Sequence, residues 1–272
     1  MTITPTQRLL CVTWEKLPDN FLLPDDPVDN LHQPLLATAL SESLGLANFI
    51  TPGMLIGTNF GLCVNVDGKT VVKAPDWFYI PQVFPISTNQ NRRSYTPRLE
   101  GDIPAIVMEF ISETDGGEYS LTPYYPFGKW YFYEQILQVP IYVIFYPLTG
   151  VLEVRELQEK RYQLRKADAQ GRYFISSMNL ALGVWQGSRM NLTGYWLRWW
   201  NQDDQILPWP EELVAIERQR IEQERQRAEQ ERLRAEQERL KAEQERLKAE
   251  QERLRADRLA ARLRELGITD QE

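Results

Sequence analysis

The residues best suited to chemistry are two acids and a lysine, carried by predicted strands and a predicted helix. Glu109 lies within the strand-like run PAIVMEFIS, where alternation places it on one face with Ala105, Val107 and Ile111. An ionised carboxylate among apolar neighbours is costly unless it is paired, hydrogen-bonded or bound to a cation. Glu109 therefore needs a partner, unless the strand ends there and the acid already reaches water.

Asp76 and Lys129 supply two further groups of the required kind. Asp76 follows Pro75 at the start of the aromatic strand pattern PDWFYI, and in isolation it is typical of an ordinary turn aspartate. Lys129 opens a predicted helix, KWYFYEQILQV, which ends near Pro140. Such a helix packs across the strand that carries Glu109, so its lysine can reach the space beside that acid.

Taken together, an aspartate at one strand, a glutamate in a later strand and a lysine on the next helix resemble the PD-(D/E)xK nuclease arrangement. The lysine is displaced, because Ile111 stands two residues after Glu109, where the usual motif has its lysine. The resemblance implies that Asp76 and Glu109 hold a divalent cation, Mg²⁺ with Mn²⁺ as a substitute, and that the Ile111 carbonyl completes the ligand set. It implies that Lys129 orients or activates the attacking water. Oxygen ligands of this kind suit Mg²⁺.

A closer resemblance extends over most of residues 30–210. The order of PDWFYI, DIPAIVMEFIS, KWYFYEQILQVPIYVIFYP and LRWWNQDDQILP is similar to the Uma-type restriction endonuclease family. The matching positions are Asp76, Glu109, Ser112, Lys129, Tyr133, Val139, Tyr142 and Pro147. Glu113, Gln138 and Tyr146 depart from the family pattern, but none of them replaces an implied metal ligand.

Three other acids are weaker candidates. The family tends to carry an acid shortly before the lysine, and this chain has Asp115 and Glu118 there, around a Gly116-Gly117 pair. The first helix of this fold often carries another acid, for which Glu42 is the candidate. The alternative, a glutamate on the solvated face of the helix, is favoured for Glu42.

Composition excludes several other functions. The net charge of −7 argues against a broad phosphate-binding surface. His32 is the sole histidine, and the sequence has no CxxC, HExxH or glycine-rich phosphate loop. Two cysteines, Cys11 and Cys63, form no disulfide framework, and neither a signal peptide nor a membrane span is visible. The expected location is the cytoplasm, without membrane association.

The elements that must position these residues predict an α/β fold. A helix over 31–48 precedes a hairpin around Asp67-Gly68, and strands and helices then alternate, with further strands continuing over 151–166 and 171–187. We expect a restriction-endonuclease-like mixed central sheet flanked by helices over residues 31–210, after an irregular arm at 1–30.

The rest of the chain has a different character. Residues 211–272 hold 17 acids and 15 bases and no aromatic residue, with leucines seven apart at 233, 240, 247 and 254. The period predicts a long charged helix over 211–268, followed by a tail at 269–272. Only one apolar position recurs per heptad, so a solvated spacer and a weak coiled coil through residues 221–266 both fit, the latter binding a second copy or another protein.

Two functions follow from these patterns. The first is a metal-dependent endonuclease that hydrolyses DNA phosphodiester bonds, using Asp76, Glu109 and Lys129. The second is a catalytically inactive scaffold with the nuclease fold, acting as an interaction protein through its helix.

Overall fold

The computed structural model describes residues 31–85, 92, 94–111 and 117–265. The predicted N-terminal arm at 1–30 and the tail at 269–272 lie outside the described residues. The chain divides into two compact units, residues 1–207 and 208–272.

A six-stranded mixed sheet forms the centre of the first unit, in the order β1-β4-β5-β6-β7-β8. Its strands are β1 (Leu55–Gly57), β4 (Trp77–Ile80), β5 (Ile106–Phe110), β6 (Ile141–Tyr146), β7 (Val151–Gln158) and β8 (Arg161–Leu164). The pair β5–β6 is parallel, and the other pairs of this sheet are antiparallel. Strands β4 and β5 are buried on both faces, as expected for central strands covered by other elements. The expected α/β class with a mixed central sheet is confirmed.

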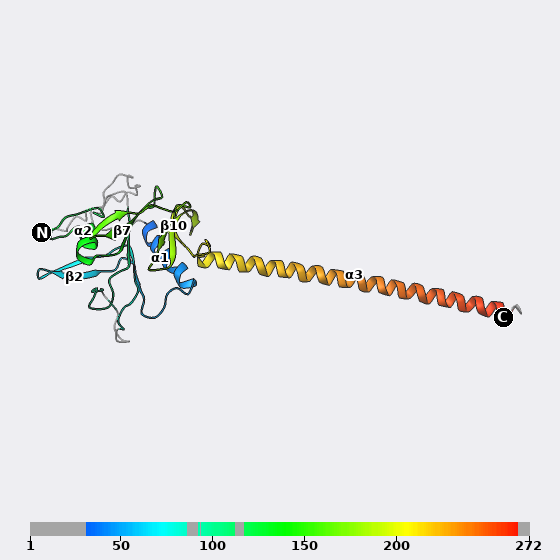
Figure 1. Cartoon of the computed structure of the whole chain (residues 1–272). Coiled ribbons are helices and arrows are strands. Elements are labelled where there is room, and N and C mark those ends of the chain that lie inside the picture. The colour runs from blue at the N-terminus through cyan, green and yellow to red at the C-terminus, as the bar shows by residue number, and fades with distance from the viewer. Residues whose placement is uncertain (1–30, 86–91, 93, 112–116, 266–272) are drawn as a thin grey trace, which may run out of the picture. The chain divides into compact units, whose positions relative to one another are not determined.

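One face of this sheet is covered by a hairpin and a short helical segment (Figure 1). The hairpin joins β2 (Leu62–Val66) to β3 (Lys69–Lys73) through Asp67 and Gly68, whose φ angles are 50° and 77°. Positive φ at both central residues is the geometry of the hairpin turn that the Asp-Gly pair predicts. Val71 of the hairpin packs in one cluster with Val107 of β5 and Tyr133.

The helical segment changes its winding along its length. It begins as α2 (Lys129–Tyr131) and continues as the π-helix η1 (Phe132–Leu137), with Gln138 in the left-handed conformation at its end. The predicted helix is therefore present, but most of it has the wider π winding, which is rare and frequent at functional sites.

The opposite face is covered by α1 (His32–Leu46) and a second sheet (Figure 1). That sheet has the order β11-β10-β9, with β9 (Tyr173–Ile175), β10 (Leu180–Arg189) and β11 (Leu192–Trp200). Trp77 of β4 donates its indole N–H to Ser41 Oγ of α1 at 3.0 Å and packs on Trp199 of β11. Strands β9 to β11 thus form a separate layer and do not continue the central sheet.

The second unit consists of one long helix, α3 (Pro210–Glu265). Proline occupies its first position, and Glu212 Oε2 accepts the backbone N–H of Trp209 at 2.8 Å, which caps the helix start. At 56 residues the helix is about 84 Å long. Its leucines at 233, 240, 247 and 254 are each about half exposed. The part of the chain that the structure describes contains no helix long and apolar enough to cross a membrane.

Candidate active site

The pairing of β4 with β5 brings Asp76 and Glu109 together. The register is antiparallel, with Trp77 opposite Met108 and Phe78 opposite Val107. Asp76 immediately precedes β4, and Glu109 follows Met108, the partner of Trp77. The two acids, 33 residues apart in sequence, are thereby near enough for the Asp76 charge to act on the Glu109 carboxyl.

The Glu109 carboxylate is enclosed and hydrogen-bonded at both oxygens. Its residue is 1% exposed. Glu109 Oε1 accepts the Tyr133 hydroxyl at 2.8 Å, and Oε2 accepts the Lys129 ammonium at 3.1 Å. Both donors come from the α2–η1 segment, four residues apart on one helical face. Glu109 therefore has two polar partners, as its burial among apolar residues requires.

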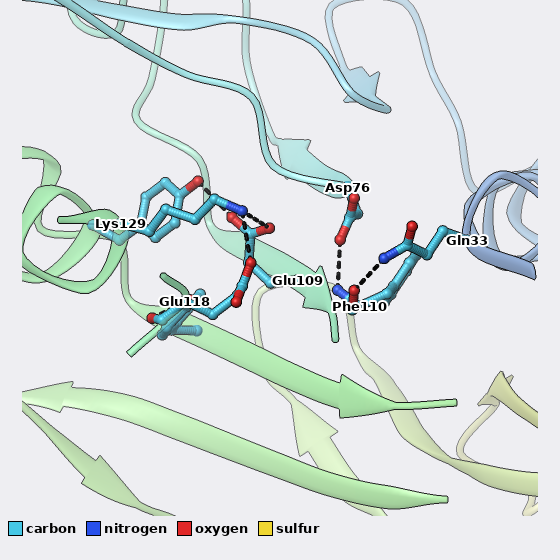
Figure 2. A network of polar contacts seen from close by, with 8 residues as sticks. Gln33, Asp76, Glu109, Phe110, Glu118 and Lys129 are labelled. Carbon is cyan, nitrogen blue, oxygen red and sulfur yellow. Dashed lines mark hydrogen bonds and ion pairs between the residues drawn. The ribbon is translucent and has the colours of Figure 1, made fainter. Parts of the chain in front are cut away.

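Lys129 binds a second acid, Glu118, in addition to Glu109 (Figure 2). Its ammonium also donates to Glu118 Oε1 at 2.9 Å. Glu118 is 6% exposed, and its other oxygen, Oε2, is buried with no hydrogen-bond donor among the described residues. The Tyr142 hydroxyl donates to the Glu118 main-chain carbonyl at 2.9 Å, which fixes the backbone at this point. Lys129 is thus held between two buried carboxylates.

Asp76 is tied to the end of β5 by a main-chain contact. Its Oδ2 accepts the backbone N–H of Phe110 at 2.5 Å, and the Phe110 carbonyl accepts Gln33 Nε2 of α1 at 2.5 Å (Figure 2). The Asp76 carboxylate therefore sits directly beside the residue that follows Glu109. Gln33 was not a sequence candidate, since an isolated glutamine on a helix gives no signal.

The charged groups of this site change one another's pKa values. Burial raises the pKa of Glu109 to about 8, because the opposing effects of the Lys129 ammonium and the Tyr133 hydroxyl are outweighed and the Asp76 charge adds to the rise. Burial lowers the pKa of Lys129, but the Glu109 and Glu118 carboxylates reverse this and raise it above its ordinary value. Lys129 is therefore a fixed positive charge near neutral pH.

A second lysine, Lys73, is electrostatically coupled to this site and was not among the sequence candidates. Lys73, at the end of β3, has its pKa lowered by burial and by the Lys129 charge, against the effect of Glu109. These couplings place the Lys73 ammonium near the site. The signal was present in the sequence, because Lys69, Val71 and Lys73 alternate on one face of the predicted strand and Lys73 stands three residues before Asp76.

The remaining sequence candidates have different positions. Ile111 follows β5, donates its N–H to the Phe145 carbonyl at 2.8 Å and packs against the core. Glu42 forms an ion pair with Arg189 of β10. His32 packs edge-on against Trp196. Ser112, Glu113 and Asp115 lie outside the described residues.

The donor set fits a hard divalent cation in its chemistry. The carboxylates of Asp76 and Glu109 lie near enough to repel each other. Separately, Glu118 Oε2 is buried without a donor from the described part of the chain. A cation satisfies such groups better than the apolar surroundings do. Within the described ranges, no three acidic, histidine or cysteine side chains already converge as a complete metal cage. A cation here would rely on Asp76, Glu109 and a main-chain carbonyl.

The sequence comparison identifies the family to which this fold and site belong. Residues 15–193 match the family model Uma2, described as "Putative restriction endonuclease". The match covers well over half of the chain, so the protein belongs to the Uma2 family of restriction-endonuclease-like proteins, and this membership suggests a nuclease. No curated protein matches the chain.

Proposed function

We propose that this protein is a metal-dependent endonuclease that hydrolyses phosphodiester bonds of DNA. The observation that carries the proposal is the buried Glu109 carboxylate with the Lys129 ammonium bound to it at 3.1 Å, beside Asp76, which accepts the Phe110 N–H. Membership of the Uma2 family supports the same reaction class.

Asp76, Glu109 and the Ile111 carbonyl are the proposed ligands of Mg²⁺ or Mn²⁺. When bound, such a cation neutralises charge on the phosphate and lowers the pKa of a water molecule that it holds. Asp76 and Glu109 hold their oxygens in place through the Phe110 N–H and the Tyr133 hydroxyl. Lys129, fixed between Glu109 and Glu118, presents a permanent positive charge that orients the attacking water and stabilises negative charge developing on the phosphate.

The test is cleavage of supercoiled plasmid DNA by the full chain with Mg²⁺, with Mn²⁺ and with a chelator. We expect cation-dependent nicking, reduced by about 10²–10³-fold in Lys129→Ala and in Glu109→Ala. Asp203→Asn is the matched control, because Asp203 is an exposed turn residue of the same charge type. Cleavage that continues in both site variants would overturn the proposal.

A catalytically inactive scaffold is the second candidate, favoured by one observation. The ammonium of Lys129 is already neutralised by two carboxylates, so the network is stable without substrate or cation. This candidate predicts a folded protein that takes up neither Mg²⁺ nor Mn²⁺ in a calorimetric titration. Cation uptake that Asp76→Asn abolishes would exclude it.

The long helix α3 is proposed to serve self-association or the binding of a protein partner through residues 221–266. Its evenly spaced leucines, each about half exposed, support this role. Glu–Arg and Glu–Lys pairs along the helix also allow it to persist alone as a spacer.

A further inference from the structure

An aromatic pocket is formed by the same hairpin and helical segment that cover the candidate active site, and it has no part in the chemistry described so far. It is a cavity of about 350 Å³ between the tip of the β2–β3 hairpin and the segment that leads into α2. Tyr124 and Tyr125 line it and are 69% and 53% exposed. Large aromatic rings exposed together around a hollow are typical of a binding surface.

The rings of the pocket are arranged for stacking. Phe127 and Tyr131 lie face to face, with centroids 5.8 Å apart and an interplanar angle of 10°. The Lys69 ammonium lies 5.1 Å from the centroid of the Tyr125 ring. The site therefore combines aromatic rings with a cation over the face of one of them, Tyr125, which suits a planar ring attached to an anionic chain.

Two separate segments connect this pocket to the candidate active site. Phe127 and Tyr131, which line the pocket, flank Lys129, which binds Glu109. On β3, Lys69 lines the pocket, and Lys73 projects from the same face of the strand at its other end, three residues before Asp76. Four residues of strand separate the two lysines by about 13 Å. A strand of nucleic acid that runs from the pocket toward Asp76 along β3 would therefore pass both lysines.

We propose that this pocket receives an unpaired base of a nucleic-acid strand whose scissile phosphate lies at Asp76 and Glu109, with Lys69 and Lys73 holding the phosphates between. The substrate class is then a single strand, or a duplex with an unpaired base beside the cleavage site. The inference rests on the proposed nuclease function and narrows its substrate.

Charge distribution favours an unpaired strand over an intact duplex. Duplex binding draws its affinity from many phosphate contacts, but residues 1–210 carry a net charge of −5, from 16 bases and 21 acids. Asp67 also lines the pocket at the hairpin tip and repels phosphate there. Phosphates are therefore expected along the lysines, and the base among the aromatic rings.

The binding test uses the full chain in a chelator, where no cleavage occurs, with a fluorescent oligodeoxynucleotide as the probe. We expect tighter binding of the single strand than of its duplex, and about tenfold or greater weakening in the double variant Tyr124→Ala, Tyr125→Ala. The variant Tyr124→Phe, Tyr125→Phe keeps the rings and is expected to keep the affinity. Phe174→Ala is the matched control, because Phe174 is also an exposed aromatic residue but lies on β9.

Two further measurements separate stacking from charge. Lys69→Gln is expected to reduce the slope of log affinity against log salt by about one, whereas the tyrosine variants leave this slope unchanged. The affinity for a single-stranded RNA of the same sequence shows whether the protein distinguishes ribose from deoxyribose. Tight binding of either single strand supports the inference, and the difference in affinity shows which of the two the protein prefers.

The inference is overturned if the duplex binds as tightly as the single strand, if the alanine double variant retains its affinity, or if neither strand binds. These outcomes can be distinguished from a failure of the nuclease proposal. That proposal fails if the protein takes up no cation and cleaves neither plasmid nor single-stranded DNA, whereas the binding assay with the tyrosine variants measures neither property.

Discussion

At the scale of single residues, Glu109 dominates the electrostatics of the site. Its carboxylate is buried, is repelled by the Asp76 charge and binds the Lys129 ammonium. Neutral pH lies below its raised pKa of about 8, so in the absence of a cation a proton competes for the same oxygens. Stability and cation affinity therefore both depend on pH through this one group.

The stability prediction follows from the sign of the shift. The folded-state pKa of about 8 exceeds the ordinary value of 4.5, so the folded protein binds the proton more tightly than the unfolded chain. The contribution of Glu109 to stability is complete below pH 4.5 and is lost as the pH rises to about 8. We expect the free energy of unfolding of the native protein, measured in urea with a chelator, to fall across this window relative to Glu109→Gln. Parallel pH profiles for the two proteins would contradict the assignment.

Cation affinity is predicted to change in the opposite direction. A metal ligand must be deprotonated, so Mn²⁺ affinity should rise with pH up to about pH 8 and level off above it. Titration calorimetry at several pH values measures this dependence. An affinity that is independent of pH in this range would show that Glu109 is not a ligand.

Substitutions of Asp76 and Lys129 are expected to have separable effects. Asp76→Asn removes a ligand charge and should abolish both Mn²⁺ uptake and cleavage. Lys129→Met removes a cation that competes for Glu109, so it should retain or increase Mn²⁺ uptake while reducing cleavage by about 10²–10³-fold. Calorimetry and plasmid nicking on the same preparations measure the two properties. Equal loss of both in the two variants would assign Lys129 a purely structural role.

At the scale of elements, the site depends on the register of β4 between its neighbours. Gly57 of β1 lies opposite Phe78 of β4, and a Cβ atom at Gly57 would come within 2.2 Å of the fully buried Phe78 ring. The absence of a side chain at this position lets β1 pair with β4 while the ring stays in the core.

Gly57→Ala is therefore predicted to lower the free energy of unfolding by about 1–3 kcal/mol, because the buried ring must shift within a packed core. Urea denaturation measures the change. Gly45→Ala is the matched control: Gly45 lies in α1, and the nearest described atom to an added Cβ is 4.0 Å away, so a gain of about 0.5–1 kcal/mol is expected. A neutral Gly57→Ala would mean that β1 shifts away from Phe78.

At the scale of the whole molecule, two units with different physical character share one chain. The first unit has a core of aromatic and aliphatic residues. In contrast, α3 has no buried residue in its 56 positions. Helix stability there comes from charge pairs such as Arg220–Glu224, and not from packing against a core.

The leucine stripe of α3 is predicted to support weak self-association. Mean helicity and mass of the full chain should then fall on dilution, and Leu240→Gln with Leu247→Gln should reduce the mass further. Circular dichroism and sedimentation velocity measure these effects. Glu238→Gln with Glu245→Gln is the matched control, because those positions lie on the other side of the helix. A concentration-independent mass would show that the helix is a lone spacer.

Much of the local structure follows from the sequence alone, because its causes are local. The Asp67-Gly68 turn, the strand around Glu109, the helix start at Pro210 and the period of α3 depend on neighbours within a few residues. The family resemblance also identifies Asp76, Glu109 and Lys129 as candidates from the sequence. Their chemical types and order along the chain are properties of the sequence itself.

Only the tertiary structure decided which groups meet. The β4–β5 pairing brings Asp76 near Glu109, and the α2–η1 segment brings Tyr133 and Lys129 to the same carboxylate. The rings of Tyr124 and Tyr125 meet the β2–β3 hairpin in one pocket, although more than 50 residues separate them in sequence. Glu42 forms an ion pair with Arg189 and is not part of the site. Contacts between residues far apart in the chain depend on register and packing, and no local pattern encodes these.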